Sequence, residues 1–170
     1  MQRLICALVC VLVGCASVPA PEVPDRVSLA DGLYIIARSD GGSPGELRPG
    51  EVRVRYDHEF MSAEERPREV LVLDSTACVP LLLASEPVPG VSEKGFTSLQ
   101  LSLAPGAKAQ LEQVTRENVG RGVALLIDGR VASTHGIKEP ITGGGFQLTR
   151  CNDEACQFVL VRLRAAQRKE

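Results

Sequence analysis

The sequence predicts an α+β domain in which a small mixed or antiparallel sheet carries two helices on one face. Apolar residues alternate over 96–103, as in a strand with one buried face. Helical stripes of apolar residues occupy 107–118 and 156–163. Between them, Asp128-Gly129 joins two short runs and is a strong hairpin signal. The predicted order of the C-terminal half is β-α-β-β-β-α.

The N-terminal half is predicted to consist of strands joined by polar loops. A strand is expected within Val27–Ala37, and Glu51–Tyr56 alternates charged and apolar residues like a half-buried or edge strand. Glu69–Leu73 is a strongly apolar strand. The remaining segments are a Gly-, Pro- and Ser-rich loop at Ser39–Gly50, a polar turn or short helix at Asp57–Arg68, a short helix or strand within Ser75–Ser85, and a loop at Glu86–Gly95.

In the C-terminal half, Pro105 suits the first turn of a helix and Gly120 suits a left-handed helix end. Val123–Ile127 is continuously apolar, as in a strand buried on both faces. The return strand of the hairpin is expected at Arg130–Ser133. After the flexible Gly143-Gly144-Gly145, a last strand is expected at Phe146–Thr149, and Asn152 can cap the final helix, whose apolar stripe is Cys156, Val159, Leu160 and Leu163.

The first fifteen residues resemble the start of a bacterial lipoprotein. Arg3 precedes an apolar run, Leu4–Val13, that is too short to span a membrane and is typical of a signal peptide. Leu12-Val13-Gly14-Cys15 looks like a lipobox, which predicts cleavage before Cys15 and lipid attachment to its sulfur. The alternative is an ordinary signal peptide with an incidental cysteine. Because no aspartate follows Cys15, the outer membrane is favoured over the inner membrane.

These features divide the chain into a signal peptide, a tether, a region of uncertain relation, a folded domain and a charged tail. The tether is rich in proline and is expected to be extended. The predicted boundaries are 1–14, 15–26, 27–68, 69–166 and 167–170.

Charge and composition exclude several functions. The 170 residues include 19 Lys and Arg against 21 Asp and Glu, and no Trp. This balance lacks the basic surface that nucleic acid requires, and no cofactor motif is present. With two histidines, neither near a cysteine in the sequence, a zinc site is not expected. Cys151 and Cys156 are close enough in sequence for a disulfide in an oxidising compartment, although two free thiols remain the alternative.

Other reactive residues have simpler structural interpretations. Asp128 fits a turn residue better than a catalytic carboxylate. Ser133 and His135 lie two apart on a strand with no defined acid partner, so a hydrolase is the weakest of the functional hypotheses. His58 would need more ligands to bind a metal. Gly143–Gly145 lacks the Lys-Ser/Thr of a nucleotide-binding loop.

An ordered series of residues in 115–149 resembles the head subdomain of the large periplasmic domain of SecD/SecDF protein-export membrane proteins. A looser likeness covers Glu69–Ala166. His135 departs from the pattern, since the family usually has proline there, and so does Arg150-Cys151. The matching residues, expected to be structural, are Thr115, Asn118, Gly120, Ala124, Asp128, Gly129, Val131, Ser133, Ile137, Glu139, Pro140, Ile141, Gly143, Gly144 and Gln147.

The resemblance implies a protein-binding or accessory module of the cell envelope or of protein export. Since none of the family's transmembrane helices is found in the sequence, proton-driven translocation is not expected of this chain. We expect no catalytic activity, no cofactor, and protein clients or envelope proteins as partners. A partner strand is expected at one of two sheet edges, Glu51–Tyr56 or the hairpin at Arg130–Ser133. The alternative is a structural outer-membrane lipoprotein.

Overall fold

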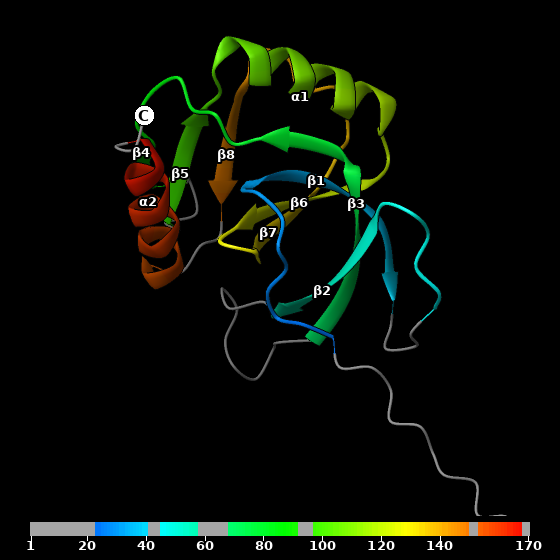
Figure 1. Cartoon of the computed structure of the whole chain (residues 1–170). Helices are drawn as coiled ribbons and strands as arrows, with labels where there is room; N and C mark the ends of the chain where they lie inside the picture. The colour runs from blue at the N-terminus through cyan, green and yellow to red at the C-terminus, as the bar shows by residue number, and fades with distance from the viewer. Residues whose placement is uncertain (1–22, 41–44, 58–67, 92–96, 150–152, 168–170) are drawn as a thin grey trace, which may run out of the picture.

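The computed structural model describes residues 23–40, 45–57, 68–91, 97–149 and 153–167 (Figure 1). The strands and helices in these ranges are β1 (Gly32–Asp40), β2 (Glu51–Asp57), β3 (Arg68–Pro80), β4 (Val88–Val91), β5 (Thr97–Ser102), α1 (Pro105–Glu117), β6 (Gly122–Ile127), β7 (Arg130–Gly136), β8 (Gly145–Thr149) and α2 (Asp153–Gln167).

The strands form two sheets in which the paired neighbours are antiparallel. The larger sheet has the order β2-β3-β1-β6-β7, and the smaller has the order β4-β5-β8. The predicted α+β class is confirmed, and so is the order of the C-terminal half, which runs β5-α1-β6-β7-β8-α2.

The larger sheet separates two hydrophobic clusters. One cluster joins a face of this sheet to the smaller sheet and to both helices, and it includes Ile35, Leu101, Leu111 and Leu160. The other cluster covers the opposite face and contains Tyr34, Val54, Tyr56, Leu71, Leu73, Ala124, Leu126 and Val131. Both helices therefore pack on the cluster that lines one face of the larger sheet, and in Figure 1 α1 lies across the top while α2 stands beside β4 and β5 of the smaller sheet.

Strand β6 contributes to both clusters. Val123, Leu125 and Ile127 belong to the first, whereas Ala124 and Leu126 belong to the second. The prediction of a strand buried on both faces is confirmed. The stripe predicted for the last helix is also buried, since Cys156, Val159, Leu160 and Leu163 all join the first cluster.

Several predicted boundaries were wrong. Residues 68–80 form one long strand, β3, whereas the sequence suggested a short strand followed by a separate element. The predicted loop Glu86–Gly95 contains strand β4, whose Pro89 and Gly90 are tolerated because β4 lies at a sheet edge. Strands β1 and β7 run past their predicted ends, to Asp40 and Gly136.

Some predicted features lie outside the described residues. They include the signal peptide, Cys15, His58, Cys151 and Asn152. Within the described ranges, neither helix has the length and apolar character needed to cross a bilayer.

Candidate functional site

Residues 24–30, which we call the strap, connect two distant parts of the larger sheet. The Arg55 amide of β2 donates to the Pro24 carbonyl at 3.0 Å, and the Val27 amide donates to the Gly129 carbonyl at 2.9 Å. At the far end, the Tyr34 hydroxyl donates to the Ala30 carbonyl at 2.8 Å. The strap thus runs from the edge of β2 to the turn between β6 and β7.

The larger sheet is curled, so that its two end strands approach each other. β2 and β7 are at opposite ends of the strand order yet contact one another. A side-chain hydrogen bond joins Tyr56 of β2 and Thr134 of β7. These strands contain the two edges expected to accept a partner strand, and the strap crosses the region between them.

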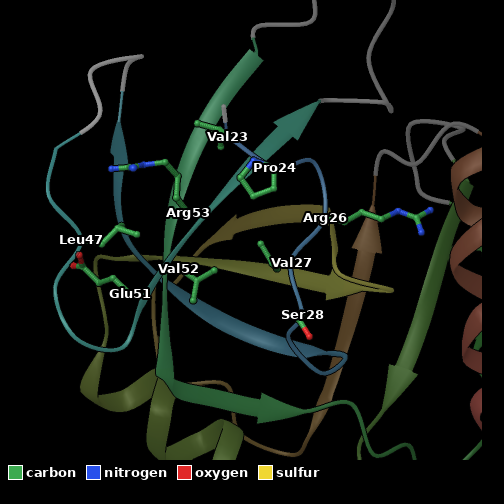
Figure 2. Close-up of a pocket in the computed structure, with 9 residues that line it drawn as sticks. All are labelled: Val23, Pro24, Arg26, Val27, Ser28, Leu47, Glu51, Val52 and Arg53. Carbon is green, nitrogen blue, oxygen red and sulfur yellow. The ribbon is translucent and has the colours of Figure 1, made fainter. Parts of the chain in front are cut away.

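A groove of about 500 Å³ lies where the strap departs from β2 (Figure 2). This volume is within the range of ligand-binding pockets. In Figure 2, the Arg26 side chain points away from Leu47 and Glu51, while the Val27 side chain projects from the strap on the side where Val52 of β2 lies. The lining of the groove is mainly apolar and consists of Val23, Pro24, Arg26, Val27, Ser28, Leu47, Glu51, Val52 and Arg53.

Glu51 fixes one end of this groove. Its carboxylate accepts two hydrogen bonds of 2.7 Å from the Arg38 guanidinium and one of 2.8 Å from the Arg48 amide. The Arg48 amide and the Arg38 side chain hold the pKa of Glu51 below its ordinary value. The Glu51 amide in turn donates to the Arg48 carbonyl at 3.0 Å. The start of β2 is therefore a turn closed by hydrogen bonds to both the side chain and the main chain of Glu51.

Asp128 and Gly129 form the predicted tight turn, with φ angles of 53° and 71°. The Asp128 amide donates to the Asp31 carboxylate at 2.7 Å. The Asp128 carboxylate lies 2.9 Å from the Arg162 guanidinium of α2 and 3.6 Å from that of Arg26. Asp128 thus links the hairpin, the strap and α2.

Three residues of the predicted family pattern lie at the end of α1, and two of them, Thr115 and Gly120, hold it to the segment after β7. The buried Thr115 hydroxyl donates to the Leu111 carbonyl at 2.7 Å and accepts from the Ile141 amide at 2.9 Å. The Asn118 side-chain amide donates to the Val114 carbonyl at 2.8 Å. Gly120, at φ 87°, donates its amide to the Ile137 carbonyl at 2.8 Å.

Four more pattern residues, Glu139, Pro140, Gly143 and Gly144, lie in the loop between β7 and β8. Gly143 and Gly144 both have positive φ, and the Gly144 carbonyl accepts from the Leu103 amide at 2.9 Å. A β-carbon on Gly144 would lie 2.7 Å from the Lys108 side chain, so the loop packs closely on α1. Glu139 is exposed and Pro140 is half-buried.

Ser133 and His135 lie on β7 without the contacts of a catalytic pair. The Ser133 hydroxyl and the His135 Nε2 are both buried, and neither has a hydrogen-bond partner in the described structure. Burial lowers the pKa of His135. Within the described ranges, no group of three or more His, Cys, Asp or Glu residues could hold a metal ion.

The cysteine predictions stay open. Cys156 is buried on α2, but Cys151 lies outside the described residues, so their disulfide stays a prediction. Cys78 is half-buried beside Tyr34, with which it shares a side-chain hydrogen bond.

Sequence reasoning did not identify the strap or its groove. The available signal was the alternation of Val27 and Leu29, which are half-buried, with Ser28 and Ala30, which are exposed. Four residues of alternation are too short to define an element, and the partners of the strap lie far away in the sequence.

Two curated relatives share part of the sequence. The protein translocase subunit SecD of Acidaminococcus fermentans is 46% identical over 48 residues, covering 28% of this chain and 11% of the relative. The protein translocase subunit SecDF of Thermus thermophilus is 38% identical over 69 residues, which cover 39% of this chain and 9% of the relative. The chain therefore matches about a tenth of the length of these relatives.

Two solved structures are also similar. One, described as "Structure and function of a membrane component SecDF that enhances protein export", is 33% identical, with a TM-score of 0.44, covering 50% of this chain and 40% of the other. The second, described as SecDF in a super-membrane-facing form, is 16% identical, with a TM-score of 0.43. The match covers 85% of this chain and 30% of the other.

A sequence model described as "SecDF, P1 head subdomain" matches residues 67–166. This range is more than half of the chain and runs from the start of β3 to the last turn of α2. It contains the hairpin and the loop whose residues carried the resemblance. This chain belongs to the SecDF P1 head subdomain family.

Proposed function

We propose that this chain is a lipid-anchored, periplasm-facing accessory of protein export, which binds extended polypeptide segments and catalyses no reaction. The match of residues 67–166 to the SecDF head subdomain carries this proposal. The relatives are named as protein translocase subunits. A related structure is described as a membrane component that enhances protein export.

The groove beside β2 is the proposed binding site. A strand edge supplies main-chain hydrogen bonds to an extended segment, and neighbouring apolar pockets select its side chains. Here an apolar groove lies directly against the β2 edge. A SecDF-like head with such a groove suits the transient binding of unfolded clients better than it suits a catalytic role.

The proposed anchor is the lipidated Cys15, and the proposed location is the periplasmic side of a membrane. The lipobox-like residues 12–15 support the anchor. The outer membrane is favoured only by the residues that follow Cys15. Metabolic labelling with a fatty acid should mark the wild type and leave Cys15→Ser unlabelled. Labelling of both proteins would refute the anchor.

Site-specific photocrosslinking in intact envelopes tests the binding function. A photoreactive amino acid replaces Leu47, which is 40% exposed at the groove. The matched control replaces Val161, which is 61% exposed on α2. We expect secreted polypeptides to crosslink at position 47 and not at position 161. No adducts at position 47, together with normal export in a deletion strain, would instead indicate a structural envelope lipoprotein.

A further inference from the structure

The strap resembles a bound peptide more than a connecting loop. Its main chain bonds to the edge of β2 at Arg55 and to the hairpin at Gly129. Its alternate side chains, Val27 and Leu29, pack against the cluster on the inner face of the curled sheet. An extended ligand added to a sheet edge uses the same combination of main-chain bonds and alternate side-chain contacts.

The two ends of the strap are held unequally. At its C-terminal end, Tyr34 binds the Ala30 carbonyl, and Asp31 accepts from the amides of Leu81 and Asp128, at 3.2 and 2.7 Å. At the other end, the Arg26 side chain is 60% exposed and lies 3.6 Å from Asp128.

The second ion pair at this end, between Arg55 and Asp25, spans 3.0 Å, and the Asp25 side chain is 60% exposed. Exposed ion pairs contribute little to stability. These ion pairs therefore add little to the hold on residues 24–29, which comes from the main-chain bonds of Pro24 and Val27 and from the packing of Val27 and Leu29.

The strap also leaves part of the edge open. It bonds to β2 at Arg55 and then turns toward Gly129, so that the groove opens between it and Glu51–Arg53 (Figure 2). An incoming segment can enter this groove first and then replace the strap at Arg55.

We propose that the strap is a built-in occupant of the β2 edge, which an extended polypeptide segment displaces when it binds. This inference rests on the proposed polypeptide-binding function and adds its regulation and its specificity. In the strap, Asp25 faces Arg55 while Val27 and Leu29 face the core. The preferred segment therefore has the pattern acidic-x-apolar-x-apolar.

Direct binding tests the displacement. The protein is the chain from residue 15 with Cys15→Ser, and the probe is a fluorescent peptide with the sequence of residues 23–31. A variant with Val27→Ser and Leu29→Ser weakens the strap, whereas Val161→Ser is the surface control. We expect the weakened variant to bind the probe more tightly than the other two, because affinity scales with the population of the open state. A peptide with serine at both apolar positions should not bind.

Amide hydrogen exchange on the Cys15→Ser chain with an unaltered strap gives a second, independent measurement. With saturating probe, the Val27 amide of the chain should lose protection, while Arg55 and the β6 amides keep theirs. Equal binding by the weakened variant and the control would overturn the inference. So would a Val27 amide that stays protected with the probe bound. If the weakened variant does not fold, the exchange result decides alone.

The two proposals fail in different ways. Client crosslinks at position 47 with a strap that stays protected would refute the displacement and leave polypeptide binding intact. Displacement by the probe without client crosslinks would refute the export role alone.

Discussion

At the scale of single residues, Gly129 is under two separate constraints. Its φ of 71° lies in the left-handed region that favours glycine. A β-carbon there would also clash with the Val27 carbonyl oxygen, which is main chain and cannot rotate away. The turn is therefore shaped both by its own backbone and by the close approach of the strap.

Replacing Gly129 by asparagine separates these constraints, because asparagine tolerates positive φ better than most residues do. We expect Gly129→Asn to lower the free energy of unfolding by about 1–3 kcal/mol, since the strap must shift to admit the β-carbon. The control is Gly120→Asn, where φ is 87° and nothing lies within 4 Å of the added atom. Urea unfolding measures both variants. Equal losses would show that the contact with the strap carries no energy.

We expect His135 to make the stability of the protein depend on pH. Burial lowers its pKa below the ordinary value of 6.5, so the folded protein favours the neutral ring. The unfolded chain then binds more protons in this window, and stability is lost as the pH falls through about 6.5 toward the folded pKa. Glu51 and Asp74, whose pKa values are also lowered, act only in the more acidic range of carboxylates.

Thermal unfolding between pH 7.5 and 5.5 measures the effect of this histidine. We expect the wild type to lose more stability over this range than His135→Gln, whose side chain does not titrate. His58 is present in both proteins and cancels in the comparison. Parallel pH profiles would assign the dependence to groups other than His135.

At the scale of elements, the sequence predicted those segments whose pattern matches their own burial. β5, α1 and α2 each have one apolar face, and β6 is apolar throughout because both of its faces are covered. β4 escaped prediction because all four of its residues are exposed. The predicted strand Glu69–Leu73 continues to Pro80 in β3, because β3 pairs with β1 along this whole length. The register of this pairing shifts between Tyr34 and Ile35.

The groove could not be predicted for a related reason. Its two sides, the strap and the start of β2, are short and are brought together by the curl of the larger sheet. The sequence predicted a half-buried or edge strand at Glu51–Tyr56, and β2 does lie at the end of the larger sheet. The bond between the β2 edge and the strap is a tertiary contact, and local sequence patterns do not predict such contacts.

The same contrast between buried and exposed strands gives a prediction for β1 and β4. Ile35 of β1 is fully buried, so Ile35→Ala should lower the free energy of unfolding by about 2–5 kcal/mol through lost burial and a cavity. Val91 of β4 is 74% exposed, and Val91→Ala should change the free energy of unfolding by less than about 0.5 kcal/mol. Denaturant unfolding of the two variants gives the comparison. A small loss for Ile35→Ala would mean that β1 is not central to the core.

At the scale of the whole molecule, the family match and the folded unit do not coincide. The match begins at residue 67, but β1 lies between β3 and β6 in the larger sheet. β1 supplies Leu33 and Ile35 to one cluster and Tyr34 to the other. Removing β1 and β2 would leave β3 and β6 without the strand that joins them, and both clusters would be open to water.

We therefore expect the fragment 67–170 to lack a cooperative unfolding transition, because the buried surface of β1 contributes to both clusters. The fragment 23–170, which keeps the strap and every described element, should unfold cooperatively with the stability of the longer chain. Circular dichroism during urea unfolding distinguishes the two fragments. Cooperative unfolding of 67–170 would show that the matched region folds alone, and that residues 23–57 are an addition to a self-sufficient head. If only 67–170 fails to unfold cooperatively, this head needs the residues before the family match, among which β1 is the strand that joins β3 to β6.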